Sequence, residues 1–336
     1  MGRREGPFLR LIGVSHLLKA AGEAYTRVKT ISDLETPLEP LLEKLGKYPA
    51  MVAREQSARL NEIKQALSVR IRLIRGKGNL RFSAGKDRHT GERYVKVGLA
   101  ALERIWAYCY GFTFLFNLVK SRPQGSLIEM KNMPEASLPW ELLRWAKVGE
   151  DKQVRFEWPN YFPKPGAEST DTYVKNTDNF FITVVGFLLL HEIGHHSLGH
   201  LDEPEDLHQF VNQEFQADDF AADLMLTHCP RESVKDILFV ARANGISTGL
   251  ALLAGIELDH PASVIRTHPK VPERLLTVFQ KYIPEDRMNP HVPEDPMYFA
   301  SVLISAFMQN CGIDFPYAAS HESYTDFFIK CMHAFP

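Results

Sequence analysis

An uninterrupted apolar run, FFITVVGFLLL at residues 180–190, passes directly into the polar sequence HEIGHH. Eleven residues are too few to cross a bilayer, which takes about 20, so the run predicts a helix buried in a protein core. Polar and charged groups at the end of such a helix need partners, because burying them alone is costly. The chain must therefore surround this helix with other elements and provide a compensating group for its His and Glu side chains.

The spacing of those polar residues indicates a metal site. His191 and His195 are four residues apart, so on a helix their side chains share one face and can bind one ion. Glu192 can reach a metal-bound water without binding the metal itself. Two imidazoles and one carboxylate leave a fourth tetrahedral position open, which suits Zn2+. The pattern predicts a zinc site in which Glu192 is the general base for attack of water on a carbonyl group.

The third ligand must come from elsewhere in the chain. The metzincin pattern HExxHxxGxxH fails, because leucines stand at its glycine and third-histidine positions. His196 and His200 are candidates, but helical spacing rotates both away from the face of His195. Glu214 begins the helical run EFQADDFAADLML, and two antiparallel helices joined by the polar turn LDEPED bring it opposite the histidines. Asp218, one turn later, is placed to hydrogen-bond a ligand histidine. The alternative for both acids is a solvated acidic face.

Periodicity along the chain predicts an α+β fold that is mainly α with a small β-sheet. Helical patterns occupy residues 15–68 (with a break near 36–40), 100–119, 179–200 and 205–226. Short strands around a polar, glycine-containing loop are expected within 69–99, and a further strand at 153–158. We predict a helical N-terminal region, 1–68, and a zinc metallopeptidase domain, 69–336. The Pro- and Trp-rich connection 121–178 is expected to border and gate the active site.

Composition excludes several functional classes. The net charge is −2, so no overall field favours nucleic acid or a membrane surface. The four cysteines form no CxxC pair, and the N-terminus lacks a signal-peptide pattern, so we expect a cytoplasmic protein with reduced thiols and no membrane partner. Residues 69–96 hold nine Lys or Arg against two acids. We interpret this segment as a solvated hairpin, although its edge could accept an extended peptide as an added strand.

Three blocks within residues 191–274 resemble a known group of enzymes. HEIGHHSLGH, EFQAD and THPKVPERL are similar to the gluzincin peptidases of the HtpX type, whose pattern is HExxH, E-[FY]-x-A-D and [ST]HPxxxxR. The first two blocks also resemble the IrrE/ImmA metallopeptidases. HtpX-type enzymes are membrane proteins, and no spanning segment is expected here. The chain looks most like the Lit-type phage-exclusion peptidases, also through IWAYCY at 105–110 and the proline-rich loop at 158–165.

The resemblance implies a gluzincin zinc-helix pair in which His191, His195 and Glu214 bind Zn2+ and Glu192 is the catalytic base. It also implies roles for residues that the spacing alone does not assign. His268 would face the metal and donate to the developing oxyanion. Arg274 would pair with Glu214 or with Asp218, which hydrogen-bonds a ligand.

These observations predict a cytoplasmic zinc endopeptidase that cleaves a protein target, with phage defence as the setting and a translation factor as the known kind of substrate in the resembling family. One alternative is a regulatory module that binds protein or nucleic acid around a structural or inactive zinc site. Glu192 argues against it, because a structural site needs no base beside an open coordination position. A repressor-cleaving regulator of the ImmA kind is a further alternative, but residues 1–68 show no convincing helix-turn-helix.

Overall fold

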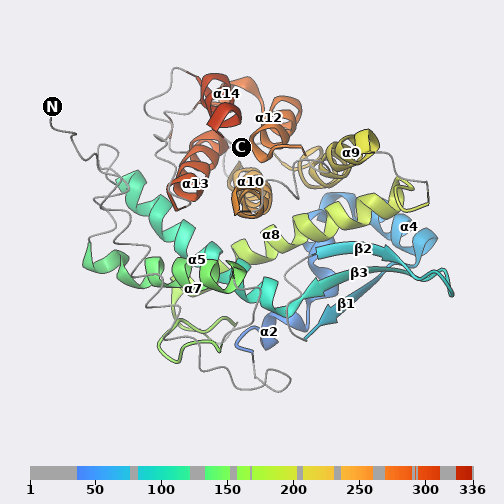
Figure 1. Ribbon diagram of the computed structural model, residues 1–336, viewed down its shortest axis with the longest axis horizontal. Coiled ribbons are helices and arrows are strands. Elements are labelled where there is room, and N and C mark those ends of the chain that lie inside the picture. The colour runs from blue at the N-terminus through green and yellow to red at the C-terminus, as the bar shows by residue number, and fades with distance from the viewer. Residues whose placement is uncertain are drawn as a thin grey trace, which may run out of the picture.

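The structure is a computed structural model, and it describes residues 36–75, 82–121, 133–151, 157–166, 169–202, 207–230, 236–259, 269–289, 292, 294–310 and 323–334. Within these residues helices predominate and one three-stranded sheet is present (Figure 1). The prediction of an α+β chain that is mainly α is therefore confirmed. Residues 1–35 lie outside the described residues, so the division of the chain at residue 68 stays a prediction.

The elements follow one another as short helices, a small sheet and then long helices. The first part holds α2 (Glu39–Leu42), η2 (Leu45–Lys47), α3 (Tyr48–Val52), η3 (Arg54–Gln56) and α4 (Ser57–Leu67). The strands are β1 (Arg70–Ile74), β2 (Phe82–Lys86) and β3 (Arg93–Gly98). The remaining helices are α5 (Leu99–Ser121), η4 (Pro134–Ala136), α7 (Ser137–Asp151), α8 (Thr172–Ser197), α9 (Leu207–Leu226), α10 (Asp236–Asp259), α12 (Val271–Tyr282), η5 (Glu285–Arg287), α13 (Pro296–Asn310) and α14 (Tyr324–Ala334).

Helix α8 is the central element of the fold. It begins where the Asp171 side chain accepts a hydrogen bond from the Tyr173 N–H at 2.7 Å, and it contains the apolar run. It packs against α3, α5, α9, α10 and β2, and Figure 1 shows it crossing between the sheet and the C-terminal helices. Among the described helices, α8 is the one whose length and composition would suit a membrane span, and 67% of its apolar window is buried inside the protein.

The sheet differs from the predicted hairpin around one loop. The strand order is β1-β3-β2, with β1 parallel and β2 antiparallel to β3. The hairpin is therefore β2–β3, and β2 was not predicted, because FSAGK has no apolar alternation long enough to signal a strand. Val95 and Val97 of β3 are buried and fix which face of the sheet packs inward. Of the two edge strands, β2 makes the more extensive contact with α8.

The connection 121–178 is more regular than predicted, and its described parts do not border the site. Residues 137–151 form α7, while 153–156 of the expected strand lie outside the described residues. Trp158 packs edge-on against Trp106 and Trp145, and Trp106 Nε1 donates to Asp178 at 2.7 Å. Asp178 is about 20 Å from His191 along α8, so this aromatic cluster stabilises the far end of the helix instead of gating the site.

Candidate metal centre

Helices α8 and α9 pack closely enough for side chains of both to share one ion. Gly194 lies at the contact, where an added Cβ would be 3.1 Å from a Phe220 ring carbon and 3.4 Å from the Ala217 Cα. A larger residue would separate the helices, because α9 lies directly over this turn of α8. The glycine in HEIGHH therefore has a structural purpose: it brings α9, with Glu214, within reach of the two histidines.

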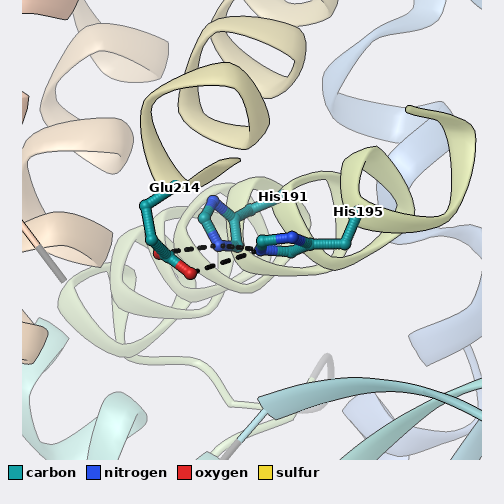
Figure 2. Close-up of side chains that lie close together, drawn as sticks. All are labelled: His191, His195 and Glu214. Carbon is teal, nitrogen blue, oxygen red and sulfur yellow. Dashed lines mark hydrogen bonds and ion pairs between the residues drawn. The ribbon is translucent and has the colours of Figure 1, made fainter. Parts of the chain in front are cut away.

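Three potential ligand atoms converge between these helices. The Nε2 atoms of His191 and His195 are 3.1 Å apart. The two carboxylate oxygens of Glu214 lie 3.5 Å from one imidazole each, Oε2 from His191 and Oε1 from His195. Figure 2 shows both rings, carried by α8, turned toward the carboxylate that descends from α9. Within the described residues, these three form a group whose ligand atoms all lie within 4.8 Å of one another.

The spacing of this group fits a tetrahedral metal ion. Bonds of 2.0–2.2 Å at a tetrahedral centre separate neighbouring ligand atoms by roughly 3.3 Å. The measured separations of 3.1 and 3.5 Å bracket that value. The donor set, two imidazoles and a carboxylate, also leaves one position for a water or a substrate. The geometry therefore fits a metal ion bound by His191, His195 and Glu214.

Two buried charged residues hold the ligands from outside. Asp218 Oδ1 lies 2.9 Å from His191 Nδ1, so the ring presents Nε2 to the shared centre. Arg274, from α12, donates to both Asp218 oxygens at 2.6 and 2.8 Å and lies 3.1 Å from Glu214 Oε2. Asp218 and Arg274 are each 1% exposed. The predicted pairing of Arg274 with Glu214 or Asp218 is thus a contact with both acids.

The electrostatics of the group favour an ionised carboxylate beside a cation. Burial alone would raise the pKa of Glu214, but the Arg274 charge and hydrogen bonds from the two histidines outweigh it and hold this pKa well below its usual value. Burial would likewise lower the pKa of His191, yet Asp218 and Glu214 raise it to about 10. The two carboxylates thus create a site that favours positive charge, which is what a divalent ion would supply.

Glu192 points to the edge strand of the sheet. Its carboxylate accepts a hydrogen bond from the backbone N–H of Ala84 in β2. Burial raises the pKa of Glu192, and the nearby Glu214 carboxylate adds to the rise while the histidines oppose it. A carboxylate with a raised pKa is a better proton acceptor at neutral pH.

Sequence spacing did not reveal several contacts at the end of α8. His196 is buried and its Nε2 lies 3.0 Å from the Tyr94 carbonyl of β3. Asp202 accepts from Lys86 at 2.6 Å and from Arg93 at 2.6 Å, so the turn after α8 is tied to the β2–β3 hairpin. The local sequence could not predict the role of Asp202, because its two partners lie more than 100 residues earlier in the chain.

His200 was expected to point away, but its ring contacts His195 with an Nδ1–Nδ1 distance of 3.0 Å. The glycine that precedes it could have signalled this, because a helix that ends at glycine reverses its chain direction. His268 lies outside the described residues, so its predicted role remains untested.

Five of the nine basic residues of the segment 69–96 form ion pairs with three carboxylates. Arg70 and Arg72 both pair with Glu92, and Arg75 pairs with Glu39. Lys86 and Arg93 are engaged with Asp202, while residues 76–81 lie outside the described part of the chain. These pairs agree with a solvated sheet surface.

Comparison with known proteins identifies the family. The cell death peptidase of Escherichia coli (strain K12) is 26% identical to this chain over 258 residues, which cover 74% of this chain and 83% of the relative. No solved structure matches the chain. The sequence profile of the Peptidase U49 family matches residues 95–292, a span that includes α8, α9 and α12. Because this match covers more than half of the chain and every described residue of the metal centre, the chain belongs to the Peptidase U49 family and is a peptidase.

Proposed function

We propose that this peptidase is a zinc-dependent endopeptidase with His191, His195 and Glu214 as metal ligands and Glu192 as general base. The observation that carries the proposal is the convergence of two imidazole nitrogens and one carboxylate at tetrahedral spacing. Zinc, when bound, acts as a Lewis acid that makes water nucleophilic near neutral pH and polarises the scissile carbonyl.

The remaining catalytic roles belong to residues of this chain. Glu192 takes the proton of the attacking water and later delivers it to the amine that leaves. Asp218 fixes the ring orientation of His191, and Arg274 keeps the Glu214 carboxylate ionised and turned toward the histidines. We also propose that His268 donates to the developing oxyanion, in line with the resemblance of THPKVPERL to gluzincin motifs.

The site favours a substrate bound in extended form along β2. Ala84 N–H reaches Glu192, so it is directed away from β3 and toward the site. In an antiparallel ladder every second residue points its backbone groups to the free edge. An extended peptide that pairs with β2 would therefore run past Glu192, which is the geometry that peptide-bond hydrolysis needs. Within the basic segment 69–96, the proposed binding edge is therefore β2, residues 82–86.

Replacing Ala84 by Pro is expected to lower kcat/KM about tenfold, because it removes the N–H that contacts Glu192 and that an extended substrate would use at the β2 edge. Arg70→Pro is the control, since Arg70 is the first residue of β1 on the opposite edge of the sheet, where proline is tolerated. Steady-state cleavage kinetics of both variants provide the measurement. Equal effects of the two prolines, or an unchanged kcat/KM in Ala84→Pro, would argue against a role of the β2 edge at the site.

We further propose that the enzyme acts in the cytoplasm on a protein target in the setting of cell death or phage defence. The name of the Escherichia coli relative, cell death peptidase, supports this setting. The resemblance to Lit-type peptidases makes a translation factor the first substrate class to test.

Metal removal tests the proposed function. Full-length protein treated with a chelator and then desalted is expected to lose cleavage activity in a bacterial extract, and zinc is expected to restore it. New protein N-termini, identified by mass spectrometry, report cleavage and also identify the substrate. Glu192→Gln protein in a parallel extract reveals background proteolysis. Cleavage that persists without metal, or that appears equally with Glu192→Gln, would rule out the zinc mechanism.

A further inference from the structure

His200 is brought to the metal centre by the way α8 ends. The helix ends at Ser197, and Gly199 has a φ of +76°, which favours glycine because a Cβ is strained there. The Gly199 N–H donates to the His196 carbonyl at 3.4 Å, and the His200 N–H donates to the His195 carbonyl at 3.1 Å. These two hydrogen bonds form a Schellman motif. It reverses the chain and returns the His200 ring to the His195 ring, with ring centroids 5.1 Å apart.

A chain of hydrogen bonds then fixes where the protons lie. His200 Nε2 is 2.8 Å from Gln216 Oε1, an oxygen that can only accept, so Nε2 carries a hydrogen. In a neutral imidazole the other nitrogen is then an acceptor. His200 Nδ1 therefore accepts from His195 Nδ1 across their 3.0 Å contact, and His195 must carry its hydrogen on Nδ1. This leaves the lone pair of His195 on Nε2, the atom that faces His191 and Glu214.

We propose that His200, held by Gln216, is the positioning residue that sets the tautomer and ring orientation of His195 for metal binding. The inference rests on the metal centre of the proposed function. The two ligand histidines thus have different supports: His191 is oriented by the Asp218 carboxylate and His195 by a neutral imidazole.

Charge balance explains why the second support is neutral. A divalent ion and Arg274 together would offset the negative charges of Glu192, Glu214 and Asp218, which are all buried or partly buried. A carboxylate at position 200 would add a further negative charge to this group. A neutral acceptor gives the same orientation without it.

The test compares zinc affinity across a matched pair of variants. His200→Phe keeps an aromatic ring but removes the acceptor, and it is expected to weaken zinc binding about 10- to 100-fold. His200→Asn keeps an acceptor oxygen near the position of Nδ1 and is expected to stay within about threefold of wild type. Competition with a chromophoric chelator gives the dissociation constants, and the absorption spectrum of cobalt-substituted protein reports ligand geometry.

A second variant keeps the proposal testable if His200→Phe fails to fold. Gln216→Leu changes an exposed position and leaves His200 in place, so it is expected to fold and to weaken zinc binding several-fold. Wild-type affinity in both His200→Phe and Gln216→Leu would overturn the positioning role while leaving the metal centre intact. If wild-type protein itself failed to bind zinc, the proposed function would fall, and the two failures are therefore distinguishable.

Discussion

Glu192→Gln is expected to lower peptide-bond hydrolysis by about 10²- to 10⁴-fold while the zinc content stays unchanged. The amide is close in size to the carboxylate but cannot accept a proton from water. Glu192 is adjacent to His191 in sequence and contacts the Ala84 N–H, so its replacement would remove the proposed base and leave the three proposed ligands in place. Activity in extracts and metal content of the same preparation are measured together.

Glu273→Gln is the matched control for this substitution. Glu273 lies on the exposed face of α12, one residue before Arg274, and the same chemical change there is expected to leave activity within about twofold. If the Glu192→Gln enzyme kept wild-type turnover, Glu192 would not be the general base. Loss of zinc in that variant would instead assign Glu192 to metal binding.

Arg274→Met is expected to destabilise the metal-free protein by about 3–5 kcal/mol, because it leaves two buried carboxylates without their shared cation. Arg274 is 1% exposed and contacts both Glu214 and Asp218. Urea unfolding measures the free energy of unfolding. Arg70→Met is the control: Arg70 pairs with Glu92 at the surface, where such a pair contributes about 0–1 kcal/mol.

The effect of Arg274→Met should depend on pH in a defined direction. In the wild type the pKa values of Glu214 and Asp218 lie below their ordinary values of 4.5 and 3.8. The lowered pKa values stabilise the folded protein at pH values above the ordinary pKa values of the two acids. This stabilisation is lost as the pH falls through the lowered pKa values of the folded state. The difference between wild type and Arg274→Met should therefore be largest near neutral pH and shrink in acid. A difference that grows in acid would contradict the burial of two ionised acids around Arg274.

Helical periodicity accounts for most of what the sequence could predict. Two histidines four apart on a helix must share a face, and a 3.6-residue repeat places Glu214 and Asp218 on one side of the next helix. The apolar run 180–190 predicted a buried helix, and the structure buries it at the centre of the fold. Local physics determines these features, so a single sequence is enough to infer them.

The features that the sequence missed depend on long-range or terminal geometry. The two expected strands, β1 and β3, do pair, but in parallel and not as a hairpin, because the unpredicted strand β2 lies between them in sequence and forms the hairpin with β3. The connection 121–178 was expected to border the site, but its Trp158 packs against Trp106 and Trp145, and Trp106 bonds to Asp178 at the far end of α8. Helical spacing placed His200 off the face of His195, but α8 ends at Ser197 and Gly199 then reverses the chain, so that spacing does not apply to His200.

Metal analysis of purified protein tests the central claim most directly. Wild-type protein prepared in metal-depleted buffers and then supplied with zinc is expected to retain about one tightly bound ion per chain after desalting. Glu214→Ala, which removes the single ligand from α9, is expected to lose that ion while far-UV circular dichroism still reports a helical protein. Wild-type protein that retains no zinc, or Glu214→Ala protein that retains it as tightly as wild type, would contradict a metal centre shared by α8 and α9.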